Sequence, residues 1–151
     1  MNIGKLIINA DDYCLSENVN LAIIELAEKK IITGTSVIVT NKKFSIKDEL
    51  YRLHNVDIGL HVNLTLGYPV SPYNDVKTLV DKNGAFYSVL NIWIRFLLGL
   101  IKKKDIYNEI EAQYNAISKH IEPSHIDTHK HIHCFPFLGD HILDCFHSLE
   151  G

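Results

Sequence analysis

The sequence has few of the features that mark several familiar classes of protein. Its three cysteines, Cys14, Cys134 and Cys145, are far apart and form no Cys-x-x-Cys pair, which argues against a disulfide framework and fits a reducing cytosol. The eight glycines are scattered, so no glycine-rich loop is available to hold a phosphate. The Gly-x-Ser-x-Gly elbow of serine hydrolases and the His-Glu-x-x-His motif of zinc proteases are also absent.

Excess charge of one sign and long apolar runs are missing too. The 15 basic and 18 acidic residues give a net charge of −3 with no basic stripe, so we expect no nucleic-acid partner. The most apolar stretch, residues 89–101, is shorter than the roughly 20 residues that a membrane span requires, and it contains Asn91 and Arg95. It predicts a helix that covers a groove or an oligomer contact, and no membrane span. The N-terminus has no signal-peptide pattern, and we expect a cytoplasmic protein.

What the sequence does contain is an alternation of short apolar strands and amphipathic helices. Strands are predicted over residues 5–10, 35–40 and 57–65 and in the histidine-rich stretch 123–136. Helices are predicted after Ser16, over 43–53, within 89–101, around 105–117 and from about residue 138. This order is typical of βα units that form a parallel sheet. With 46% hydrophobic residues, the chain is long enough to bury a core as one domain.

The histidine-rich stretch, residues 123–136, is the most unusual part of the sequence. It places five polar side chains on odd-numbered positions: His125, Asp127, His129, His131 and His133. In an extended chain all five would share one face, and in a helix the histidines would still pair at i,i+4. Imidazoles bind metals and transfer protons near neutral pH, so the stretch favours a functional site over a polar surface loop.

Two more polar clusters stand at predicted strands. Asp11 and Asp12 follow the first strand, and His61, Asn63 and Thr65 share one face of the third. The carboxyl ends of parallel strands meet at one edge of a sheet, where active sites are built. Two histidines and one carboxylate can hold a metal there, with a second carboxylate as general base. Taken singly, the aspartates could equally cap a helix, and His61 would more often be a core histidine.

Three segments, residues 6–16, 58–65 and 123–133, resemble the signature blocks of the YdjC/ChbG-like carbohydrate deacetylases. The resemblance runs in order through nearly the whole chain and includes the turn at 81–86. It implies a hydrolase that removes the N-acetyl group from acetylated amino sugars such as chitooligosaccharides. The implied fold is an α/β (β/α) barrel of the polysaccharide-deacetylase type. The implied cofactor is a divalent metal ion, Mg²⁺ in the family, with Zn²⁺ or another transition metal as an alternative.

The resemblance also implies roles for individual residues. The metal ligands would be Asp12, His61 and His125. Asp11 would be the base that activates water, and His129 or His131 would protonate the leaving amine, a choice that stays open at this stage.

Members of that family are usually much longer than this chain. About four βα units can be counted, too few for an eight-unit barrel, so residues 1–151 are expected to be a single domain and a truncated N-terminal portion of a deacetylase barrel. Its open edges would need a second copy or a complementing C-terminal chain to cover them. Two rival interpretations are a non-catalytic remnant that binds metal or sugar, alone or as half of a split enzyme, and a metal-dependent phosphoesterase.

Overall fold

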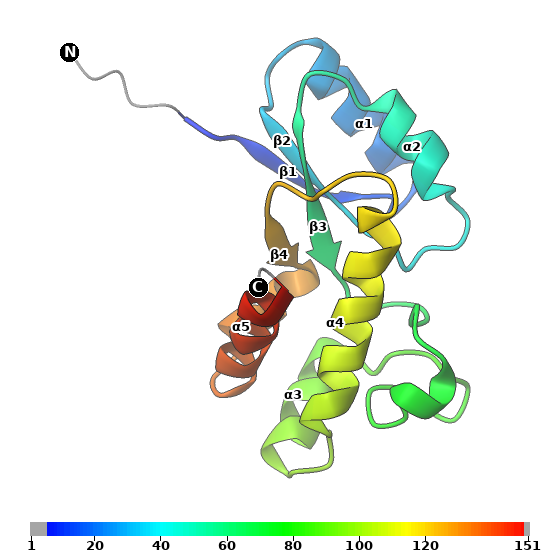
Figure 1. The fold of residues 1–151 in the computed structure, drawn as a ribbon, viewed down its shortest axis with the longest axis vertical. Coiled ribbons are helices and arrows are strands. Elements are labelled where there is room, and N and C mark those ends of the chain that lie inside the picture. Colours follow the sequence, from blue (N-terminus) through cyan, green and yellow to red (C-terminus); the bar gives the residue numbers. More distant parts are fainter. Residues whose placement is uncertain (1–5, 150–151) are drawn as a thin grey trace, which may run out of the picture.

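A computed structural model describes residues 6–149 and shows a four-stranded parallel sheet with helices packed around it (Figure 1). The strands are β1 (Asn9–Tyr13), β2 (Gly34–Val37), β3 (Asp57–Val62) and β4 (Ile126–Thr128), and they pair in the order β1-β2-β3-β4. The α-helices are α1 (Glu17–Glu28), α2 (Ile46–Arg52), α3 (Val89–Leu97), α4 (Lys103–Ser118) and α5 (Leu138–Leu149). Two short 3₁₀ helices are η1 (Tyr73–Asp75) and η2 (His129–Cys134). The predicted α/β class, with βα units and a parallel sheet, is confirmed.

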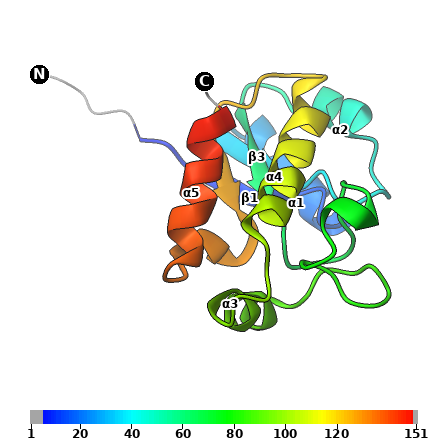
Figure 2. The same ribbon diagram turned by 60° about the horizontal axis from the view of Figure 1, so that its bottom comes forward.

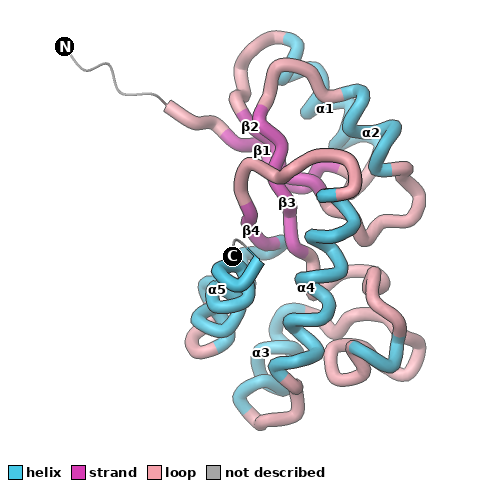
Figure 3. Tube along the Cα trace, in the orientation of Figure 1, coloured by secondary structure: helices cyan, strands magenta, loops and turns pink. Residues whose placement is uncertain are grey.

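The helices form where capping residues and apolar periodicity favour them. Ser16 accepts a hydrogen bond from the Val19 amide and caps α1, as predicted. The apolar part of the buried face of α4 consists of isoleucines at helical spacing: Ile106, Ile110 and Ile117. Figures 2 and 3 show α4 and α5 beside β3 and β4, while α1 and α2 lie together toward the other edge. Among residues 6–149 no helix has the length and apolar character needed to cross a membrane.

The sheet has one apolar and one polar face, because side chains alternate along each strand. Val37, Leu60 and Val62 are fully buried in the core. Their neighbours on the opposite face are polar: Ser36 on β2 and His61 on β3. The register pairs His61 with Asp127 of β4. The polar face is therefore continuous across the three strands.

The first strand lies later in the sequence than predicted. Strand pairing begins at Asn9, opposite Gly34, and not at Lys5, which lies outside the described residues. Leu6 and Ile7 are exposed and lie before the strand, so the prediction that residues 6–8 belong to it was wrong. The reason is that β1 is an edge strand that bonds only to β2 within the described chain. As a consequence, Asp11 and Asp12 lie inside the strand and not after it.

The other strands are shorter than their sequence patterns suggested. β2 ends at Val37, where the pattern extends to residue 40, and β3 ends at Val62, where it extends to residue 65. In the histidine-rich stretch only residues 126–128 form a strand, and a 3₁₀ turn begins at His129. Lys130 and His131 have positive φ values of 56° and 50° inside that turn. The five polar side chains of the stretch therefore do not share one face.

Candidate metal centre

A bulge in β1 turns two adjacent carboxylates toward the polar face of the sheet. The β1–β2 register shifts between Ala10 and Tyr13, and Asp12, between them, has a φ of 71°. A bulge re-aims side chains that would otherwise point to opposite faces. Asp11 and Asp12 each have a carboxylate oxygen close enough to the ring of His61 to share a metal ion with it. The local backbone thus provides two acidic groups around one histidine.

His61 has polar neighbours at both ring nitrogens. Its Nδ1 lies 2.6 Å from Oδ1 of Asp127 and 3.1 Å from the hydroxyl of Ser36. Ser36 in turn donates to Oδ2 of Asp127 at 2.9 Å. The Nε2 of His61 faces Oδ1 of Asp12 at 3.1 Å. A histidine oriented by a carboxylate at one nitrogen, with the other directed at an acidic group, has the arrangement typical of a metal ligand.

His129 completes this cluster from the first position of η2. Its Nδ1 lies 2.7 Å from Oδ1 of Asp12, and its ring meets the ring of His61 edge-on at a centroid distance of 5.6 Å. The Nε2 of His129 is buried and has no hydrogen-bond partner among the described residues. An unpaired buried nitrogen costs free energy unless a ligand satisfies it. The structure thus brings Asp12, His61 and His129 together.

His125, the third ligand implied by the resemblance, does not join this cluster. His125 precedes β4 and lies two residues before Asp127 in the sequence. That step is roughly 7 Å along a strand. The ring of His125 packs against Gly59, where a Cβ atom would overlap it. The Nδ1 of His125 contacts the hydroxyl of Ser124 at 2.9 Å. His125 is on the polar face, but near the opposite end of the strands from His129.

The remaining histidines of the stretch lie outside the cluster as well. His131 is exposed, and its ring meets the ring of His133 edge-on at 6.2 Å. His133 contacts the hydroxyl of Thr128 through Nδ1. Of the two histidines predicted as proton donors, the structure therefore places His129 against Asp12 and leaves His131 facing solvent.

The pKa values of the two histidines in the cluster, His61 and His129, are shifted in opposite directions. Burial alone would lower the pKa of His61, but the hydrogen bond and charge of Asp127, together with nearby Asp12 and Asp11, outweigh it and raise that pKa. Burial would raise the pKa of Asp127, but its contacts with His61 keep it below the usual range. For His129, burial prevails over Asp12 and lowers the pKa. The lowered pKa favours the neutral imidazole of His129, the form that binds metals.

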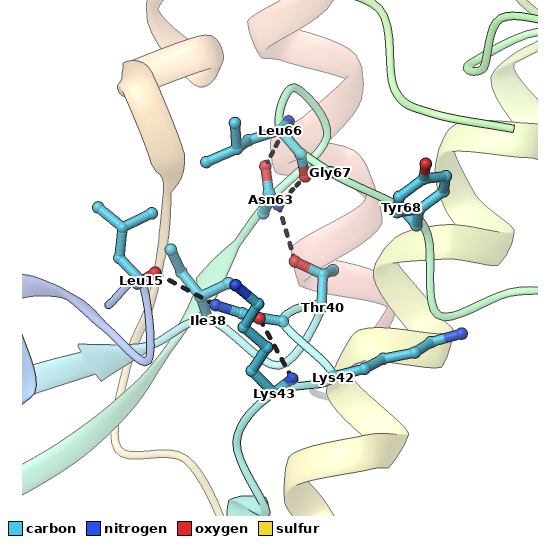
Figure 4. A pocket seen from close by; sticks show the side chains of 10 residues that line it. Leu15, Ile38, Thr40, Lys42, Lys43, Asn63, Leu66, Gly67 and Tyr68 are labelled. Atoms are coloured by element: carbon cyan, nitrogen blue, oxygen red, sulfur yellow. Dashed lines mark hydrogen bonds between the residues drawn. The ribbon is translucent and has the colours of Figure 1, made fainter. Parts of the chain in front are cut away.

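A cavity of about 510 Å³ adjoins the carboxyl ends of the strands (Figure 4). Ile38 and Asn63, which line it, each follow a residue of the polar face (Ser36 and His61) by two positions. Figure 4 shows the side chain of Asn63 in the cavity wall, where its Nδ2 donates hydrogen bonds to the hydroxyl of Thr40 and to the main-chain carbonyl of Leu66. The cavity is also lined by Lys42, Lys43 and Tyr68. Its volume is in the range of pockets that bind small molecules.

Comparison with known proteins identifies the family. The sequence pattern of the YdjC-like proteins matches residues 5–150. This chain belongs to the YdjC-like protein family. It is 34% identical to a carbohydrate deacetylase of Halalkalibacterium halodurans over 134 residues, covering 85% of this chain and 54% of that protein. It is 32% identical to a chitooligosaccharide deacetylase of an Enterobacter species, covering 88% of this chain and 52% of that protein.

A crystal structure shows the same fold in another YdjC-like protein. A protein of Enterococcus faecalis described as acting in cellobiose-phosphate cleavage superposes with a TM-score of 0.77 at 30% identity. The match covers 95% of this chain and 54% of that one. The chain spans about half the length of the curated relatives that it matches.

Sequence reasoning missed two residues that support the centre. Ser36 links His61 to Asp127, and Asn9 donates to Oδ1 of Asp11 at 2.9 Å. Both stand on the polar face at alternate positions of their strands, which is the one signal that could have identified them. Asp127, from the histidine-rich stretch, contacts Nδ1 of His61 and is placed to orient its ring.

Proposed function

We propose that this chain carries the metal centre of a carbohydrate deacetylase, a hydrolase that removes the N-acetyl group from acetylated amino sugars. The observation that carries the proposal is the cluster of Asp12, His61 and His129, with His61 oriented by Asp127. The names of the YdjC-like relatives, carbohydrate and chitooligosaccharide deacetylase, support the reaction. The activity of the whole protein is part of the proposal, because the chain matches about half of each relative.

The residues present fit a divalent metal ion. Asp12, His61 and His129 would hold it, and the close grouping of their ligand atoms supports that assignment. Two imidazoles and one carboxylate suit Zn²⁺, Mn²⁺, Co²⁺ or Fe²⁺, whereas Mg²⁺ prefers oxygen ligands. Such an ion supplies Lewis acidity toward the acetamide carbonyl and toward water.

The other polar residues around the cluster can move protons. Asp11 is exposed, and its carboxylate is held by Asn9 next to His61, so we assign it the removal of a proton from the attacking water. Breaking the C–N bond requires a proton on the leaving amine. We assign that proton to His131, because it is exposed and follows His129 by two residues, while His129 is held by Asp12.

The cavity beyond the strand ends is the place we propose for the sugar. It is lined by the side chain of Tyr68 and by amide, hydroxyl and ammonium groups. Sugar rings present apolar faces to aromatic residues and hydroxyls to polar ones, so this lining is suited to a carbohydrate. Because Ile38 and Asn63 continue the strands of Ser36 and His61, an acetamido group can point from the cavity toward the cluster.

The test combines metal binding with acetate release. We expect wild-type chain, freed of metal, to bind Zn²⁺ or Co²⁺ with one-to-one stoichiometry in isothermal titration calorimetry. His61→Ala should abolish binding, while His54→Ala, at an exposed histidine away from the cluster, should leave it intact. The metal-loaded full-length protein should release acetate from N-acetylated chito-disaccharide, and Asp11→Asn should remove that activity without loss of metal. Absence of metal binding, or hydrolysis of phosphoesters in place of acetamides, would refute the proposal.

A further inference from the structure

The segment that carries Asp12 has an unusual backbone. Asp12 and Cys14 have φ values of 71° and 72°, in the left-handed region, and neither is glycine. Such a conformation is strained for a residue with a side chain and persists only where surrounding contacts enforce it. Asp12 must also reach His61 and His129 at once, at 3.1 and 2.7 Å. The contacts that hold residues 12–14 therefore control the geometry of the centre.

Those contacts converge on Glu49, a carboxylate of α2 that is 7% exposed. Its Oε2 accepts a hydrogen bond from the hydroxyl of Tyr13 at 2.7 Å and from Nδ2 of Asn20 at 3.1 Å. Arg52, one turn later in α2, donates to both carboxylate oxygens at 3.1 Å. Hydrogen bonds to a charged acceptor are the strong ones. Glu49 thus links β1, α1 and α2 at one point, in the region where Figure 1 shows the two helices together.

Asn20 connects Glu49 to the strained main chain at Cys14. Its Oδ1 accepts the amide N–H of Cys14 at 2.7 Å, and Asn20 is fully buried. Tyr13 provides a second connection, since its side chain is fully buried and its carbonyl accepts the amide N–H of Ile38, the residue that follows β2. Tyr13 and Cys14, the two residues that follow Asp12, therefore have little freedom once Glu49 is in place.

We infer that Glu49 is a positioning residue for the metal centre: through Tyr13 and Asn20 it fixes the left-handed turn that aims Asp12 at His61 and His129. The inference rests on the proposed function, since it assigns Asp12 to metal binding. Among the described residues, the hydrogen-bond partners of the Glu49 side chain are Tyr13, Asn20 and Arg52, and none of these is a histidine or lines the cavity. Its role is to keep the aspartate in place before metal binds, so that little reorganisation is needed on binding.

A purely structural role would lower stability without changing the site, and Asp105 provides the matched control. Asp105 is also a carboxylate that is 7% exposed, and it accepts hydrogen bonds from the amide and hydroxyl of Thr78, remote from the centre. Glu49→Ala and Asp105→Ala should both lower the melting temperature. At a temperature where both are folded by circular dichroism, Glu49→Ala should bind Co²⁺ about tenfold more weakly, as expected for loss of a supporting residue. Asp105→Ala should bind Co²⁺ as wild type does.

The visible absorption spectrum of bound Co²⁺ gives a second measurement, because it reports the coordination geometry. We expect an altered spectrum in Glu49→Ala and an unaltered one in Asp105→Ala. Should Glu49→Ala fail to fold, Tyr13→Phe removes one hydroxyl only and should weaken Co²⁺ binding severalfold. Wild-type affinity and spectrum in a folded Glu49 or Tyr13 variant would overturn the inference while leaving the metal centre itself established. Failure of the wild type to bind Co²⁺ would overturn both.

Discussion

His61 is restricted by its neighbours on three sides. Asp127 contacts one ring nitrogen, Asp12 faces the other, and the ring of His129 meets its edge. A side chain held on three sides loses little further freedom when it binds a ligand. The ring is therefore oriented before any metal arrives, and the remaining ligands can be tested one at a time.

The first prediction separates the two candidates for the third ligand. His129→Ala should lower the affinity for Zn²⁺ by more than the 10–100-fold that loss of a supporting residue costs, about two orders of magnitude or more. His125→Ala should leave that affinity unchanged, because His125 packs over Gly59 at the other end of the polar face. Isothermal titration calorimetry on both variants measures the difference. The reverse ranking would restore His125 as the ligand.

The second prediction concerns the thiols and their pH dependence. Burial raises the pKa of Cys14 to about 12 and that of Cys145 to about 11, from an ordinary value of 9.0. A thiol whose pKa is raised by folding stabilises the protein below pH 9.0, and that contribution is lost as the pH rises toward the raised value. Cys134 is exposed. Near pH 8, iodoacetamide should therefore modify Cys134 alone, because the thiolate is the reactive form.

Mass spectrometry after partial labelling checks this prediction. Labelling in denaturant, where all three thiols are accessible, is the control. The free energy of unfolding should also decline between about pH 9 and 11, and less steeply in Cys145→Ala, because that variant lacks one of the groups that the folded state keeps protonated. Rapid native labelling of Cys145 would contradict the burial seen in α5.

At the scale of elements, α4 fixes the loop that follows β3. Gln113 accepts the amide N–H of Asn63 at 2.9 Å and donates to its carbonyl at 2.7 Å. Glu109, also fully buried, accepts the amides of Val70 and Ser71 at 2.9 Å each. Two polar residues of one helix thus replace the strand partner that the main chain of this loop lacks. Because Asn63 lines the cavity, α4 determines the shape of the cavity wall.

The third prediction tests this helix-to-loop contact. Gln113→Ala leaves the amide and carbonyl of Asn63 buried without a partner, at about 1–3 kcal/mol for each group. The free energy of unfolding from urea titration should fall by about 2–4 kcal/mol. Asn115→Ala, at an exposed position of the same helix, should change it by less than about 0.5 kcal/mol. Equal effects of the two variants would show that the loop is held by other contacts.

At the scale of the whole molecule, the described sheet is open at both edges. Within residues 6–149, β1 bonds only to β2 and β4 only to β3. Beside β1, Leu6 and Ile7 are 76% and 78% exposed. Open strand edges and exposed apolar side chains are surfaces on which other chains can pair. A homodimer and a complementing C-terminal chain both stay predictions.

The fourth prediction follows from this open edge. In sedimentation velocity, the 151-residue chain should self-associate as its concentration rises, and Ile7→Lys should reduce that association because a charge at an edge opposes pairing. Leu21→Lys, at a position of α1 that is 52% exposed, is the control and should have little effect. A wild-type chain that stays monomeric at all concentrations, or equal effects of the two lysines, would contradict it.

Much of the fold was predictable from local patterns. The order of strands and helices, the Ser16 cap and the polar face of β3 all depend on side-chain periodicity and on capping, which neighbouring residues determine. The boundaries of β1 were not predictable in this way. The apolar run at residues 6–8 has the pattern of a buried strand whether or not another strand pairs with it. Where the strand begins was decided by its pairing with β2.

For the site, local sequence specifies which residue types are available: two adjacent aspartates, a histidine on a strand and a histidine-rich stretch. Which of them meet depends on how the chain folds. The bulge at Asp12 and the 3₁₀ turn at His129 bring those two side chains to His61, while the register of β4 sets His125 against Gly59. Periodicity assumes regular dihedral angles, and the site is built where φ becomes positive. Such angles are set by long-range contacts, including those of Glu49, and no local pattern encodes them.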